Sequence, residues 1–65
     1  MDKKVFTPKK TGGWQIVVEG KPEEAHIRCT GKVPFAISRV VSAKEGNGLI
    51  DTFDSLCHLA GLLTA

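Results

Sequence analysis

Cysteine is scarce in this 65-residue sequence, which contains only Cys29 and Cys57. Two cysteines allow one disulfide, whereas secreted domains of this size usually carry four or more. The scarcity argues against a disulfide-bonded framework and favours the cytoplasm. We therefore expect both cysteines to be small buried side chains.

Long hydrophobic runs are also lacking. The longest stretch without a charged residue, 55–65, is only long enough for a short helix, whereas a membrane span needs roughly 18 apolar residues. The apolar segment near the N-terminus, 5–8, is too short for the core of a signal peptide. We expect no membrane partner.

Strong net charge of either sign is missing too, since nine Lys and Arg residues face seven Asp and Glu residues. Dedicated nucleic-acid-binding domains are usually more basic. The charges are nevertheless uneven: residues 1–10 hold four lysines, residues 32–44 hold three cations and no acid, and residues 45–65 hold three acids and no Lys or Arg. Such runs usually form a solvated surface.

What the sequence does have is the composition of an ordinary globular protein, with 42% apolar and 25% charged residues. A chain this short buries only roughly 60% of the surface it exposes when unfolded, so its stability is marginal. We expect residues 1–65 to form one small domain.

Short segments rich in β-branched and aromatic residues alternate with Gly- and Pro-containing turns, a pattern typical of an antiparallel meander. The predicted strands are 4–7, 14–19, 25–30, 35–42 and 49–53. A helix is expected to begin near Leu56, with Asp54 and Ser55 as capping residues. The predicted fold is α+β: a four- or five-stranded antiparallel meander with one short C-terminal helix packed on one face.

The segment 33–45 also fits a second structure. Asn47-Gly48 between apolar runs is a strong hairpin signal and favours a strand before it. The apolar residues of 33–45 also cluster on one side of a helical wheel, with Pro34 able to open a helix and Gly46 able to end it. We favour the strand because the segment is rich in β-branched residues.

Alternation assigns the faces of the predicted sheet. We expect one face to pack under the helix as a core formed with helical leucines. These core residues are Trp14, Ile16, Ile27, Phe53, Leu56, Leu59 and Leu63. The opposite face is expected to carry Gln15, Val17, His26 and Arg28, joined by Lys4 and Phe6 from the first strand.

Residues with catalytic or metal-binding chemistry are few. His26 and Cys29 should point to opposite faces of a strand, and Cys57 and His58 diverge by about 100° on a helix. Neither pair has the geometry of a structural zinc knuckle. We expect no metal, no cofactor and no enzymatic activity.

A small chain without catalytic groups usually acts through a binding surface. The predicted function is a regulatory or adaptor module that binds a protein partner or a second copy of itself. The expected partner-binding residues are Phe6, Val17, His26 and Arg28. Phe6 and Val17 are expected to form an exposed apolar pair, and such a pair usually marks an interaction site. The open edges of the meander offer a second means of pairing.

Nucleic-acid binding is the alternative. Lys4 and Arg28 beside an aromatic ring would suit phosphates and bases, and Lys9 and Lys10 lie in the Gly-flanked loop 8–13. The Thr52-Phe53-Asp54-Ser55 corner is similar to the sheet-to-helix corner of integrase arm-type DNA-binding domains. That resemblance implies a sheet that lies in the major groove of DNA. We assign no binding residue from it.

Overall fold

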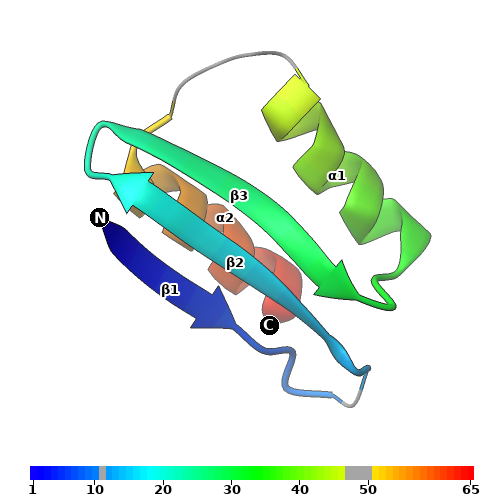
Figure 1. Ribbon diagram of the computed structural model, residues 1–65. Coiled ribbons are helices and arrows are strands. Elements are labelled where there is room, and N and C mark those ends of the chain that lie inside the picture. Colours follow the sequence, from blue (N-terminus) through cyan, green and yellow to red (C-terminus); the bar gives the residue numbers. More distant parts are fainter. Residues whose placement is uncertain (11, 47–50) are drawn as a thin grey trace.

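The computed structural model describes residues 1–10, 12–46 and 51–65. Three antiparallel strands form one sheet in the order β1-β2-β3. Two helices follow, of which α2 lies across one face of the sheet and α1 lies alongside β3 (Figure 1). The α+β class is therefore confirmed. The elements are β1 (Asp2–Phe6), β2 (Trp14–Lys21), β3 (Glu24–Gly31), α1 (Phe35–Gly46) and α2 (Phe53–Thr64).

The three strands form a meander whose register fixes the two faces of the sheet. Val5 lies opposite Val17 in the β1–β2 pair, and Val18 lies opposite Ile27 in the β2–β3 pair. Since cross-strand partners share a face, the odd-numbered residues of β1 and β2 lie on the same face where these strands pair. The three N-terminal strands predicted from the sequence are confirmed, each with slightly different bounds.

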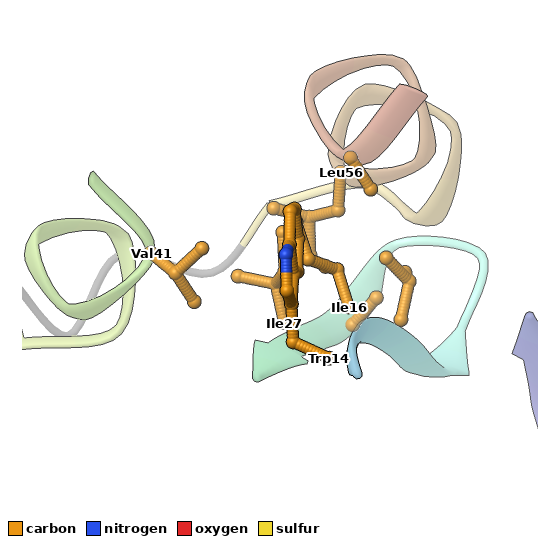
Figure 2. Close-up of a cluster of buried hydrophobic side chains, with 8 residues drawn as sticks. Trp14, Ile16, Ile27, Val41 and Leu56 are labelled. Atoms are coloured by element: carbon orange, nitrogen blue, oxygen red, sulfur yellow. The ribbon is translucent and has the colours of Figure 1, made fainter. Parts of the chain in front are cut away.

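The core lies between the sheet and the helices. Trp14, Ile16 and Ile27 from the sheet pack with Leu56 from α2, and Val41 points toward this cluster from α1 (Figure 2). Phe53, Leu59 and Leu63 are half-buried at its margin. Four of the seven predicted core residues are thus confirmed as buried, and the other three lie at the margin of the core. Val18, Ala25, Val41 and Ala60 are buried as well.

The predicted strand 35–42 is wrong, because this segment is part of helix α1. Pro34 lies directly before the helix, where its missing N–H is harmless, and its carbonyl accepts the N–H of Ser38 at 3.0 Å. Ile37 and Val41, four residues apart, both pack against the core. Burial of this helical stripe outweighs the weak strand preference of β-branched side chains.

The predicted fifth strand is also not formed as expected. Residues 49–50 lie outside the described residues, Asp51 makes an isolated bridge with Ala25, and Phe53 already belongs to α2. Asn47-Gly48 lies outside the described residues as well, but a hairpin there needs a preceding strand, and that segment is α1. The described residues therefore form two helices rather than the one predicted.

Helix α2 begins three residues earlier than predicted. Its N-cap is Thr52, whose hydroxyl oxygen accepts the backbone N–H of Ser55 at 3.1 Å. Asp54 lies in the first turn, where its negative charge interacts favourably with the positive end of the helix dipole. The predicted capping residues thus lie inside the helix, one turn away from the true cap.

Candidate functional site

The face of the sheet opposite α2 is open, and the front of the sheet in Figure 1 shows no helix over it. The register places on this face the predicted residues Gln15, Val17, His26 and Arg28. Their neighbours there include Lys3, Glu19 and Glu24. The face therefore carries mixed charge rather than a basic surface.

Val17 does not offer the exposed apolar anchor that we expected, because only 4% of its surface is accessible. It lies in the central strand between Val5 and Arg28. Arg28 Nε donates to Glu19 Oε1 at 3.0 Å, so its aliphatic stem runs beside Val17. The same contact lowers the pKa of Glu19, with the hydrogen bond from Arg28 as the largest cause.

Lys4 and Phe6 lie on the other face of the sheet from the one we predicted. Phe6 is opposite Ile16 and packs against the core, and Lys4 is opposite Val18 with its ammonium 5.3 Å from the centre of the Phe6 ring. A shift of one residue in register moves every side chain to the other face, and alternation within one strand does not reveal that register. The predicted group of Lys4, Phe6, His26 and Arg28 is therefore divided between two faces.

Helix α1 presents a surface that the sequence interpretation missed, because the segment was assigned as a strand. Its outer side consists of Phe35, Ala36, Arg39, Val40 and Ala43, all exposed. Phe35 is 76% exposed and Val40 is 42% exposed. The guanidinium of Arg39 lies 5.8 Å from the centre of the Phe35 ring. The helical alternative considered for 33–45 would have placed Phe35 and Arg39 one turn apart, which is the signal for this side.

The edge of β1 is the other open feature of the sheet. β1 pairs with β2 on one side, and no strand in the described part of the chain pairs with its outer edge. The outer edge of β3 is partly occupied, because Ala25 N–H donates to the Asp51 carbonyl at 3.1 Å. Lys3 and Lys4 lie on the open strand, and edge lysines discourage strand addition.

Cations gather at one end of the molecule, which we call the lysine end. It is formed by the loop between β1 and β2, with Lys9 and Lys10, and by the loop between β3 and α1, with Lys32. Gly13 and Gly31 hold these loops together, since a Cβ on Gly31 would lie 2.3 Å from the Gly13 carbonyl oxygen. The described residues of these two loops include no acid.

The thiols and other possible ligands form no metal centre among the described residues. No group of three or more His, Cys, Asp or Glu side chains is placed there to hold a metal ion. Cys29 and Cys57 are not joined by a disulfide. Burial raises the pKa of Cys57 above its ordinary value, which disfavours the reactive thiolate. No helix in the described ranges combines the length and apolar character needed to cross a bilayer.

Comparisons with family models, with curated proteins and with solved structures found no match to this chain.

Proposed function

We propose that this chain is a small non-enzymatic regulatory or adaptor module of the cytoplasm that binds a protein partner through the outer side of α1. One observation carries the proposal: only part of the apolar surface of α1 is covered by the fold. Ile37 and Val41 face the core, while Phe35 and Val40 on the outer side are exposed.

The residue types on the outer side are those that contribute most to protein interfaces. Aromatic and arginine side chains dominate the energy of binding when a partner desolvates them. Phe35 and Arg39 lie one helical turn apart and already contact each other. A single exposed hydrophobic residue is ordinary, but the contact between Phe35 and Arg39 forms an aromatic–arginine anchor on the outer side.

Charge defines the partner further. Residues 32–44 include Lys32, Arg39 and Lys44 and no acid. Lys44 donates to Asp51 at 3.0 Å, which leaves Lys32 and Arg39 available to acidic groups of a partner. The complementary surface is therefore an apolar pocket with an acidic rim, since complementary charges steer association and exclude other partners.

A photo-crosslinking amino acid at position 35 tests the proposal in the cells that produce the protein. The same group at position 62 is a matched control, because Leu62 is also an exposed apolar residue, at 63%, but lies on α2. We expect a polypeptide adduct from position 35 and not from position 62, and we expect Arg39→Glu to reduce it. Equal adducts from both positions, or none from position 35, would contradict the proposal.

Nucleic-acid binding has one specific observation in its favour, the lysine end. Nucleic-acid binding through the sheet face loses support because Lys4 and Arg28 lie on opposite faces of the sheet. Lys9, Lys10 and Lys32 remain together at one end. Affinity for an oligonucleotide should then fall by roughly 0.7–0.9 log units per decade of salt for each phosphate neutralised. Lys9→Gln with Lys10→Gln should reduce that slope, and Arg39→Glu should leave it unchanged.

A further inference from the structure

The loop between β1 and β2 encloses a shallow depression of about 510 Å³. Its lining includes Lys9, Lys10, Trp14 and Gln15. The remaining lining residues carry no charge, so every charged group of the depression is a cation.

Trp14 supplies a second, independent feature of this depression. The side chain is 7% exposed, yet within the described residues its indole N–H donates no hydrogen bond. Every fully buried polar side-chain atom in the described residues has a hydrogen-bond partner. The indole N–H has none, so it is not fully buried in the core. Burial of a tryptophan normally satisfies this donor. A fixed N–H donor that lines a cationic depression is suited to an anion.

The backbone holds this donor and the lysines close together. A Cβ on Gly12 would lie 2.3 Å from Trp14 Nε1, so only glycine lets the loop approach the indole so closely. Lys9 N–H donates to the Thr64 carbonyl at 3.3 Å, which ties the loop to the end of α2. The lysine side chains are exposed and therefore able to close on a ligand.

From these features we infer that the depression between Lys9, Lys10 and Trp14 binds a phosphate group. Two ammonium groups would neutralise its charge, and the indole N–H would fix one oxygen in place. The inference goes beyond the proposed protein-binding role of α1 and does not depend on it. The phosphate could belong to a small phosphorylated molecule or to a nucleic-acid backbone, and the experiment separates these two sources.

A structural role for the lysines makes a different prediction. The C-terminal end of α2 carries the negative end of the helix dipole, and its last turn has no basic residue. Lys9 and Lys10 near Thr64 would compensate that dipole. Their removal would then lower the thermal midpoint and would not change the response to phosphate.

The only tryptophan of the chain makes the test direct, because its indole N–H gives one resolved signal in a proton–nitrogen NMR spectrum. Pyrophosphate is titrated at constant ionic strength, with sodium chloride as the balancing salt. We expect a saturable shift of the Trp14 indole signal. Lys9→Gln with Lys10→Gln should weaken binding at least about tenfold, whereas Lys21→Gln, at the opposite end of the molecule, should bind as the parent does.

Two further arms complete the experiment. Trp14→Phe keeps an aromatic side chain at this position but removes the N–H donor, and the Gly12 and Gly13 amide signals should then report weaker binding. A short single-stranded oligonucleotide that shifts the indole signal more tightly than pyrophosphate identifies a nucleic-acid source; the reverse order identifies a small phosphorylated ligand. The absence of a saturable shift with either probe, or an equal shift in the double-lysine variant, overturns the inference.

Discussion

Leu56 and Leu59 lie three positions apart on α2, yet the fold buries them to different extents. Leu56 is 3% exposed and belongs to the buried cluster, whereas Leu59 is half-buried at its margin. The cost of deleting a side chain depends on how much buried volume is lost and on how well the site can collapse. Both leucines follow the same periodic pattern, so only the structure separates them.

We therefore expect Leu56→Ala to lower the free energy of unfolding by about 2–5 kcal/mol, a large part of the stability of so small a domain. Leu59→Ala should cost less, because its side chain already meets solvent. Urea denaturation followed by circular dichroism measures both. Equal losses for the two variants would show that α2 packs on the sheet in a different orientation.

Asp51 joins α1 to the start of α2 through its carboxylate. It accepts from Lys44 Nζ at 3.0 Å and from the Thr52 backbone N–H at 2.9 Å. These bonds lower the pKa of Asp51 below its ordinary value of 3.8, with the Lys44 hydrogen bond as the largest cause. The ionised carboxylate therefore stabilises the folded chain above its ordinary pKa, and this contribution is lost as pH falls through the lowered folded value.

The stability of the parent chain should accordingly decrease from about pH 6 to about pH 2.5. Asp51→Asn should lose stability at the higher pH and change little at the lower pH, so its pH dependence should be flatter. Lys44→Gln should flatten it in part, since the Thr52 N–H remains. Urea midpoints at the two pH values provide the measurement, and a parallel loss at both would exclude Asp51 as a source of the pH dependence.

At the scale of elements, two glycines show how differently the same residue is used. Gly31 ends β3 with a φ of +85°, and a Cβ there would lie 2.3 Å from the Gly13 carbonyl oxygen. Gly61 lies within α2, has an ordinary backbone conformation, and has open space where a Cβ would stand. Gly31 is required because its positive φ and close backbone contact exclude a side chain. Gly61 has no such role and only lowers the stability of the helix.

Gly61→Ala should raise the free energy of unfolding by up to about 1 kcal/mol, because glycine costs that much in a helix interior. Gly31→Ala should lower it by more than that amount, since it adds both an unfavourable φ and a backbone clash. Thermal melts of the two variants form a matched pair. Stabilisation by Gly31→Ala would mean that the two loops of the lysine end do not touch.

Helix α1 differs from α2 in how it is supported. α1 packs along β3, whereas α2 contacts all three strands. Val41 is its one fully buried residue among those described, with Ile37 half-buried beside it. The helix that we propose as the partner-binding surface is thus also the one that the fold holds least firmly.

For the whole molecule, this uneven support predicts an order of local opening. Elements with few buried apolar contacts open at lower free energy than the core. The amides of α1 should therefore exchange with solvent faster than those of β2 and α2 in native-state hydrogen exchange. Val41→Ala should accelerate exchange in α1 more than in β2. Protection of α1 equal to that of β2 would refute this order.

Charge is also distributed over the whole molecule. Lys9, Lys10 and Lys32 lie at the lysine end, and the opposite end carries the acidic turn after β2 and the start of α2, with Glu23 and Asp54. The small net charge of the sequence conceals this separation. It arises because antiparallel elements return their loops to the same two ends.

The sequence by itself determined the three N-terminal strands, the C-terminal helix and the core between them. Those features depend on short-range patterns: alternation in β2 and β3, and the spacing of Leu56, Leu59, Ala60 and Leu63. The inner face of the sheet could be predicted because alternation within a strand needs no knowledge of its partner.

Only the tertiary structure decided the identity of 35–42, the side of the sheet on which Lys4 and Phe6 lie, and the depression at Trp14. The first depended on whether Ile37 and Val41 could be buried against β3, a long-range gain that outweighs local strand preference. The second depended on the register of β1 against β2, in which a shift of one residue exchanges the faces. The third required the loop between β1 and β2 to fold close against the buried Trp14, where Gly12 lies beside the indole.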